Sequence, residues 1–314
     1  MKYYRKNKVP ALDDLNLSVK EGQIFTLLGR NGAGKTTFLR IATTQLLPSS
    51  GTLTVFGLDS KEKAKEIRRR IAITPQEAKP LWTLNAYDHV LLALLMRGES
   101  VGSASAKTKR VLETLELEEY AKVHSEELSG GLRQRILIAM TIACDVELMF
   151  LDEPTIGLDP VGRRKVWNEL IRLKQEEGKT IVLSTHYMDE AEALSDELAI
   201  IDHGHVLASG TPAEVCSKHL GSKIRVDVAS GFSDSELEDY GKVIKFGNLS
   251  RVFLDEATAE KLSKEALGRK ASISISPVTL DDAFVEIVGS TIDEDEGGTD
   301  EDDEGGSRMG AMGR

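Results

Sequence analysis

The chain has 314 residues, of which 40% are hydrophobic and 29% charged, so its composition predicts a sizeable folded core and excludes wholesale disorder. The net charge of −11 is concentrated at the C-terminus, where residues 291–314 carry −7; the remaining −4 disfavours nucleic acid as a partner. Two cysteines, Cys144 and Cys216, exclude a disulfide framework and indicate a reducing cytosol. No signal segment or membrane-spanning apolar run is present.

Strand and helix patterns alternate through most of the chain and predict an α/β fold. Apolar runs predict buried strands at residues 24–28, 148–151 and 181–184, and a helix at 36–44 follows the first strand. Helical periodicity predicts three helices between the first two strands, at 86–96, 106–115 and 132–144. Residues 198–208 form a predicted hairpin that closes this domain.

A second set of elements begins near Gly221. Strands are expected at 223–228, 243–246, 251–254 and 271–276, and helices at 234–240 and 258–267. A last helix begins at Thr279, with Asp282 three residues later in capping-box spacing. We therefore assign residues 1–220 to the main domain, 221–290 to a small α+β accessory domain and 291–314 to a disordered acidic tail.

A glycine-rich segment follows the first predicted strand and fits the pattern G-x-x-x-x-G-K-[ST]. The candidate nucleotide-binding residues are Gly29, Arg30, Asn31, Gly32, Ala33, Gly34, Lys35, Thr36 and Thr37. Successive backbone N–H groups of such a loop point at phosphate oxygens, and the following helix adds its dipole. Lys35 supplies a positive charge for the β- and γ-phosphates, and the Thr36 hydroxyl is a candidate Mg²⁺ ligand. These features favour nucleotide binding over a plain strand-to-helix turn.

Two carboxylates, Asp152 and Glu153, follow the apolar strand at 148–151. Open α/β sheets bind ligands at this end of their strands. Asp152 is a candidate Mg²⁺ ligand, and Glu153 is a candidate to orient or deprotonate the attacking water. Paired acids alone more often form a solvated turn. Downstream of a phosphate loop they predict nucleotide hydrolysis.

The segment Leu128-Ser129-Gly130-Gly131 precedes an apolar helix and lies shortly upstream of the acidic strand. In isolation it is a common loop. Beside the two motifs above, it resembles the signature element of the ATP-binding subunits of ABC transporters. The resemblance covers roughly residues 1–217, with its motifs in the expected order. Leu132 and Gly157 replace residues more usual in that family, and neither change removes a catalytic group.

The resemblance implies roles for further residues. Gln76 matches the Q-loop glutamine, which senses Mg²⁺ and the attacking water. Asp159 matches the D-loop, and His186 matches the switch histidine that contacts the γ-phosphate. Tyr4 is the counterpart of the aromatic that stacks on adenine, with Tyr3 nearly as good. The implied catalytic set is Glu153, His186 and Gln76, and the implied metal set is Thr36, Gln76 and Asp152.

In that family two cassettes face each other. Ser129, Gly130 and Gly131 are therefore expected to bind ATP held by a second cassette, either another copy of this chain or a related chain. The resemblance implies a P-loop ABC ATPase core with a helical subdomain at about 77–145, and ATP and Mg²⁺ as cofactors. It also implies a separate integral membrane permease and a cytoplasmic, peripheral location on the inner face of the cell membrane.

The expected activity is ATP hydrolysis that energises transport. Residues 279–284 are similar to the ending of cassettes that serve drug, lipid or polysaccharide exporters, although a capped structural helix has the same pattern. The alternative is a soluble ABC-type ATPase in iron–sulfur assembly, repair or translation. The accessory domain, the single cassette and the lack of a heptad run between Lys35 and Asp152 argue against that alternative.

Three other features favour structural interpretations. His203 and His205 flank a predicted hairpin tip and make a poor metal pair. The basic run at residues 68–70 is typical of a solvated helix face. Trp82, next to Leu81, either docks a partner or packs within the helical subdomain.

Overall fold

The structure, a computed structural model, describes residues 1–4, 9–221 and 223–297, without the side chains of Phe246 and residues 290–297. It divides into two compact units, residues 1–215 and the chain from Cys216 onward. This border lies inside helix α8 (Pro212–Leu220), slightly before the expected boundary after residue 220. No helix among the described residues is both long enough and apolar enough to cross a membrane.

The first unit is built on a six-stranded sheet in the order β4-β5-β6-β1-β7-β8. The strands are β1 (Ile24–Leu28), β4 (Ile71–Thr74), β5 (Leu148–Asp152), β6 (Thr180–Thr185), β7 (Glu197–Asp202) and β8 (His205–Gly210). All neighbouring pairs are parallel except β7 and β8. The three predicted strands and the hairpin are confirmed, with ends shifted by no more than two residues.

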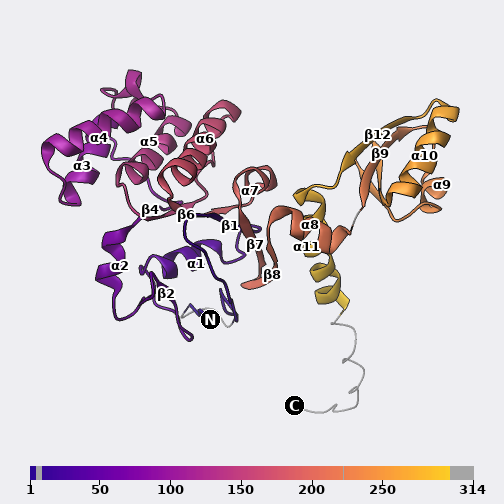
Figure 1. Ribbon diagram of the computed structural model, residues 1–314, viewed down its shortest axis with the longest axis horizontal. Helices are drawn as coiled ribbons and strands as arrows, with labels where there is room; N and C mark the ends of the chain where they lie inside the picture. Colours follow the sequence, from indigo (N-terminus) through magenta and orange to yellow (C-terminus); the bar gives the residue numbers. More distant parts are fainter. Residues whose placement is uncertain (5–8, 222, 298–314) are drawn as a thin grey trace, which may run out of the picture. The chain divides into compact units, whose positions relative to one another are not determined.

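Helices cover both faces of this sheet. They are α1 (Lys35–Ala42), α2 (Ala64–Arg70), α3 (Ala86–Met96), α4 (Val101–Thr114), α5 (Gly130–Ala143), α6 (Pro160–Glu177) and α7 (Met188–Leu194). Short 3₁₀ turns (Glu118–Tyr120 and Ser125–Glu127) join α4 to α5, and a two-stranded sheet, β2 (Thr54–Val55) and β3 (Leu58–Asp59), precedes α2. Figure 1 shows α3 to α6 on one side of the strands and α1 and α2 on the other.

The strands are apolar on both faces because both faces are covered. In β5, Met149 and Leu151 belong to one buried cluster, which also contains apolar residues of α3, α4, α5 and α6. Leu148 and Phe150 of the same strand belong to a second cluster, which contains residues of α1 and α2. Successive side chains of a strand point to opposite faces, so this alternation fixes how β5 sits between the two helical layers.

Side-chain caps set where the helices of the helical region begin. Asn85 accepts a hydrogen bond from the Asp88 N–H at 2.8 Å, and α3 has the predicted bounds. Ser100 accepts from the Ser103 N–H at 3.3 Å, so α4 begins at Val101 rather than at the predicted residue 106. An N-cap oxygen satisfies a backbone donor that the helix leaves unpaired.

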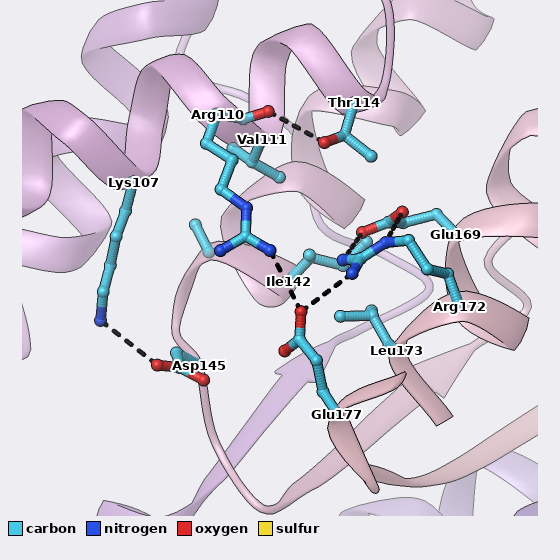
Figure 2. Close-up of a pocket in the computed structure, with 11 residues that line it drawn as sticks. Lys107, Arg110, Val111, Thr114, Ile142, Asp145, Glu169, Arg172, Leu173 and Glu177 are labelled. Carbon is cyan, nitrogen blue, oxygen red and sulfur yellow. Dashed lines mark hydrogen bonds and ion pairs between the residues drawn. The ribbon is translucent and has the colours of Figure 1, made fainter. Parts of the chain in front are cut away.

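A cavity of about 130 Å³ lies between α4, α5 and α6, and ion pairs line it (Figure 2). Arg110 of α4 and Arg172 of α6 both donate to Glu177 Oε1, at 3.2 and 3.0 Å. Arg172 also donates to both carboxyl oxygens of the buried Glu169, at 2.7 and 2.8 Å. Each of these arginines is paired with a carboxylate. The ion pairs therefore join the helical region to α6, and neither arginine is left as a free charge for a ligand.

The second unit has a four-stranded antiparallel sheet in the order β10-β11-β9-β12. Its elements are β9 (Ile224–Ser230), α9 (Asp234–Glu238), β10 (Val243–Phe246), β11 (Leu249–Leu254), α10 (Glu256–Arg269), β12 (Ser272–Pro277) and α11 (Leu280–Gly297). Its core contains Val226, Val252 and Leu262, none of which is exposed. The strands and helices predicted for an α+β unit are all present, with small shifts at their ends.

A buried ion-pair cluster joins α11 to the strands of this unit. The Asp282 carboxyl accepts from Arg225 Nη1 at 3.1 Å and from Arg251 Nη1 at 2.9 Å. It also accepts from the Thr279 N–H and hydroxyl, both at 2.9 Å. Arg251 donates to Asp227 at 2.7 Å. We call these five residues the C-terminal charge cluster. The predicted contact between Thr279 and Asp282 is present, and Asp282 has further partners that the spacing does not indicate.

The helix α11 extends into the segment that we expected to be a disordered tail. Residues 291–297 are helical, and the rest of the expected tail, 298–314, lies outside the described residues. Once a helix is nucleated, each further residue adds a hydrogen bond at little cost, so an acidic stretch without an apolar pattern can continue it.

Candidate functional site

The glycine-rich loop joins β1 to α1 and ends in a tight backbone approach. Gly34 has φ +109°, and a Cβ there would lie 2.6 Å from the Ala11 carbonyl oxygen, so only glycine fits. Gly204, at the tip of the β7–β8 hairpin, approaches the same carbonyl oxygen: an ideal Cβ at Gly204 would lie 2.9 Å from Ala11 O. The Gly204 N–H donates to Ala33 O at 3.0 Å. The hairpin tip therefore supports the phosphate loop from outside.

Lys35 begins α1 and lies almost fully buried beneath this loop, 5% exposed. Its Nζ donates to Gly29 O at 2.7 Å and to Arg30 O at 3.1 Å. The same atom lies 3.2 Å from Glu153 Oε1, and Glu153 is also 5% exposed. The ammonium group is thus held between the loop and the end of β5, where it can act on a phosphate.

Asp152 and Glu153 lie where β5 ends, and the neighbouring strand β6 holds both. Ser184 pairs with Asp152 in the strand register, and its Oγ donates to Asp152 Oδ1 at 2.5 Å. The Glu153 N–H donates to Ser184 Oγ and Ser184 O, both at 3.1 Å. Glu153 has φ +50°, an uncommon value for a residue with a side chain. This turn directs the Glu153 carboxyl toward Lys35.

Burial raises the pKa of Asp152. Hydrogen bonds from Ser184 and Thr36 and the charge of Lys35 act in the opposite direction, and the neighbouring Glu153 adds to the rise. A cation bound at this carboxyl would stabilise its ionised form. The Thr36 hydroxyl oxygen also lies 3.4 Å from Gln76 Oε1. The expected metal residues thus lie together, and their hydroxyl, amide and carboxylate oxygens suit Mg²⁺.

His186 follows β6 and contacts the Glu153 carboxyl. Its Nδ1 lies 3.0 Å from Glu153 Oε2, while Lys35 Nζ approaches the other carboxyl oxygen. The imidazole is half-buried, and its ring centroid is 4.1 Å from that of Tyr187. Two groups expected in hydrolysis, Glu153 and His186, are therefore in direct contact although they are 33 positions apart.

Tyr4 lies next to the first turn of α1. Its hydroxyl and the Thr37 hydroxyl are 3.3 Å apart. The ring is partly exposed (36%), as a stacking surface for a base must be, and Tyr3 is more exposed still (44%). The structure thus places Tyr4 beside the phosphate loop.

The signature residues lie at the N-terminus of α5. The Ser129 hydroxyl accepts from the Leu132 N–H at 3.3 Å and so caps the helix. The start of this helix packs closely against the segment before Asp159, since an ideal Cβ at Gly131 would lie only 3.3 Å from Gly157 O. Asp159 itself caps α6 by accepting from the Gly162 N–H at 2.6 Å. None of the hydrogen bonds described for this chain joins Ser129, Gly130 or Gly131 to the phosphate loop.

Three residues of this region were missed in the sequence. The sequence predicts a strand that contains Ser184, but its contact with Asp152 depends on which strands are neighbours. For Gly204, within the predicted hairpin, the sequence indicates only a turn. Glu190 lies in an acidic helical stretch, where nothing in the pattern marks it as buried; the structure places it at 0% exposure.

The features with structural interpretations stay outside this site. His203 is well exposed (76%), and its imidazole lies 3.7 Å from Asp202. Within the described residues, no group of three or more His, Cys, Asp or Glu side chains could hold a metal ion. Trp82 is 54% exposed, with the Arg133 guanidinium 5.0 Å from its ring. The residue therefore does not serve as a buried core side chain.

Comparison with known proteins identifies the family. A family model described as "ABC transporter" matches residues 12–156. The chain is 32% identical over 300 residues to the daunorubicin/doxorubicin resistance ATP-binding protein DrrA of Streptomyces peucetius, covering 92% of this chain and 91% of that protein. It is also 32% identical over 292 residues to Nod factor export ATP-binding protein I of Rhizobium sp. (strain N33), covering 90% and 94%.

A solved structure agrees with this assignment. The ATP-binding cassette MJ0796, in a dimeric post-hydrolysis state bound to ADP and Pi, is 28% identical with a TM-score of 0.63. The similarity covers 67% of this chain and 95% of that one. The expected P-loop ABC ATPase fold is thereby confirmed. The chain belongs to the ATP-binding subunits of the ABC transporter family, and it binds and hydrolyses ATP.

Proposed function

We propose that this subunit hydrolyses ATP to drive export through a separate integral membrane permease. One observation carries the catalytic part: at the end of β5 the Glu153 carboxyl contacts Lys35 through one oxygen at 3.2 Å and His186 through the other at 3.0 Å. The direction of transport is supported by the two relatives above, one named for drug resistance and the other for Nod factor export. The proposed cargo is therefore a drug, lipid or polysaccharide type of molecule.

In this proposal each catalytic residue has one task. Lys35 binds the β- and γ-phosphates of ATP, together with the backbone N–H groups of the loop. Glu153 accepts a proton from the water that attacks the γ-phosphorus, and ADP is the leaving group. His186 contacts the γ-phosphate and holds the Glu153 carboxyl through its Nδ1. Tyr4 stacks on the adenine.

Thr36, Gln76 and Asp152 would hold Mg²⁺. When bound, this ion neutralises charge on the phosphate oxygens. The protein contributes a hydroxyl, an amide and a single carboxylate, which leaves coordination positions for phosphate oxygens and water, as Mg²⁺ requires. Chelation of the metal is expected to abolish hydrolysis.

The proposed working unit contains two cassettes. Ser129, Gly130 and Gly131 of one cassette bind the ATP held by the other, and Asp159 communicates between them. Ser129 caps the 14-residue helix α5, whose N-terminal N–H groups and dipole favour a phosphate group. The matched solved structure is a dimer, which supports this arrangement. The second cassette is another copy of this chain or a related chain.

We further propose that the subunit is cytoplasmic and peripheral on the inner face of the cell membrane, where the permease holds it. The names of both relatives favour coupling to transport over a soluble ABC-type ATPase. The accessory unit belongs to the similarity as well, because the matches to DrrA and to the Nod factor protein cover about nine tenths of the chain.

The test is light scattering of Glu153→Gln with Mg-ATP. Loss of the proton acceptor should stall hydrolysis while ATP contacts remain, so a stable dimer is expected. Glu153→Gln/Ser129→Arg is the matched control: it keeps the phosphate loop and places a bulky cation where the second nucleotide binds, so it should remain monomeric.

Two results would argue against the proposal. A dimer that persists without ATP would show that association does not depend on the nucleotide. A monomer with ATP bound would exclude a homodimer, and if the variant also fails to associate with a candidate related cassette, the two-cassette unit is wrong.

A further inference from the structure

Glu190 is a buried carboxyl that the proposed mechanism does not use. It lies in α7, four residues after His186, and none of its surface is exposed. The Thr155 hydroxyl and the Trp167 indole N–H both donate to its Oε1, each at 2.9 Å. Its other oxygen, Oε2, has no hydrogen-bond partner among the described residues. Burying a carboxyl costs free energy, so its presence here calls for a reason.

The two donors come from different segments. Thr155 lies in the loop that follows Glu153 and is itself 1% exposed. Trp167 lies in the middle of α6. Glu190 belongs to the helix that follows His186. One carboxyl oxygen therefore ties together the segment after the expected proton acceptor, the segment after the expected switch histidine and the helix between them in sequence.

Glu153 needs such support because its backbone is strained. Its φ of +50° is disfavoured for a residue with a side chain and persists only where the surroundings impose it. On the strand side, Ser184 holds the Glu153 N–H. On the other side, Gln134 Nε2 donates to Pro154 O at 3.0 Å. At the next residue, the Thr155 hydroxyl donates to Glu190. The turn is anchored at both ends.

A second contact between α6 and the segment of His186 reinforces the first. The Arg163 guanidinium lies 4.5 Å from the Tyr187 ring, which packs on the His186 ring. Arg163 also donates to Asp189 at 3.1 Å. The segment that follows His186 is therefore joined to α6 through both Arg163 and Trp167.

We propose that Glu190 is a positioning residue for the Glu153–His186 pair, acting through Thr155 and Trp167. The inference rests on the roles proposed for Glu153 and His186. A carboxyl that only braced α6 against α7 would affect stability and leave the chemistry unchanged. A positioning carboxyl affects the rate of the chemical step, because small misplacements of a catalytic group cost large factors in rate.

The test uses the full chain and compares kcat, KM for ATP and Tm. Glu190→Ala is expected to lower kcat about 10- to 100-fold, the range for residues that orient catalytic ligands, with KM within about threefold. Glu190→Gln keeps an oxygen acceptor for Thr155 and Trp167 and should recover most of the rate. Thr155→Val should lower kcat about 10-fold. The double variant Thr155→Val/Glu190→Ala should be no slower than Glu190→Ala alone.

Glu169→Gln is the matched control, because Glu169 is also a buried glutamate, but it pairs with Arg172 at the cavity of Figure 2. It should lower Tm and leave kcat unchanged. A Glu190→Ala variant that lowers Tm but hydrolyses ATP at the wild-type rate would overturn the inference, as would independent effects of Thr155 and Glu190. If Glu190→Ala does not fold, Glu190→Gln and Thr155→Val decide the matter through their kcat.

Failure of the positioning inference is distinguishable from failure of the proposed function. If Glu153→Gln hydrolyses ATP normally, the role proposed for Glu153 is wrong whatever Glu190 does. If Glu153→Gln is inactive and Glu190→Ala retains the full rate, only the inference about Glu190 fails.

Discussion

Each unit of this protein buries a carboxylate beside a basic side chain, and the two arrangements differ in how completely the charges are satisfied. Asp282 in the C-terminal charge cluster receives two arginine and two threonine hydrogen bonds, on a regular helix start. Glu153 contacts one lysine and one histidine, on a backbone with φ +50°.

The difference separates a structural charge from a reactive one. A carboxylate that already accepts four hydrogen bonds, two of them from arginines, stabilises its surroundings and has little capacity left for a substrate. A carboxylate held by few partners on a strained backbone can exchange them for water and phosphate. Burial alone does not distinguish the two cases, because both side chains are nearly inaccessible.

The largest expected effect is that of Glu153→Gln on hydrolysis. Loss of the proton acceptor should lower kcat by about 10² to 10⁴. Lys35 loses its buried anion but keeps its hydrogen bonds to Gly29 O and Arg30 O and can still donate to the amide oxygen, so the free energy of unfolding should fall by only about 1 kcal/mol. Steady-state ATPase assays and denaturant unfolding of the same preparation check both statements. A large loss of stability would remove the contrast with Asp282.

The isosteric change Asp282→Asn is the counterpart in the other unit. Neutralising this carboxylate removes one of the two anions that Arg225 and Arg251 share and leaves only Asp227, so we expect a loss of about 3 kcal/mol in the stability of that unit. Hydrogen exchange of the β9 and β11 amides measures it. ATP affinity is the control, since the residues assigned to the nucleotide all lie within residues 1–215. Unchanged exchange would show that the cluster is not structural.

Gly204→Ala has a smaller expected effect and tests the support of the phosphate loop. A methyl group there meets Ala11 O at 2.9 Å and Leu12 Cα at 3.0 Å, on a residue with φ +82°. We expect a loss of about 1–2 kcal/mol in stability and a weaker affinity for ATP. Gly57→Ala is a matched control, since Gly57 has φ +73° but nothing within 4 Å of its ideal Cβ. Equal ATP affinities for the two variants would exclude a role for the hairpin tip.

The smallest effect concerns pH. Burial raises the pKa of Glu190, against the hydrogen bonds from Trp167 and Thr155 and the charge of Arg163. Above the ordinary glutamate range, the folded chain therefore keeps a proton that the unfolded chain has lost, so this group's contribution to stability falls as pH rises. Glu190→Gln does not titrate. Its stability relative to wild type should increase with pH across that window, as unfolding curves at several pH values can measure.

Local motifs made most of the fold and the site predictable. The phosphate loop and the acidic pair each consist of neighbouring residues, and their chemistry is visible in a few consecutive letters. The strands ended almost where their apolar runs end, because a strand covered on both faces must be apolar throughout.

What could not be predicted depends on contacts between distant segments. Ser184 meets Asp152 only because β5 and β6 are neighbours, and Gly204 meets the phosphate loop only because β7 lies beside β1. The arginine partners of Asp282 come from two strands, β9 and β11, and the capping-box spacing does not predict them. The end of α11 was misjudged because helix propagation does not need an apolar pattern.

The position of β1 has a consequence for synthesis of the chain. It lies between β6 and β7 in the sheet, and the hairpin tip that supports its loop comes later still. At roughly 5–20 residues per second, the ribosome releases the phosphate loop on the order of ten seconds before these segments. During that interval the nascent chain carries the motif but exposes both backbone edges of β1, a template for unwanted pairing. The ATP site therefore forms late in synthesis, although its best-known motif is made first.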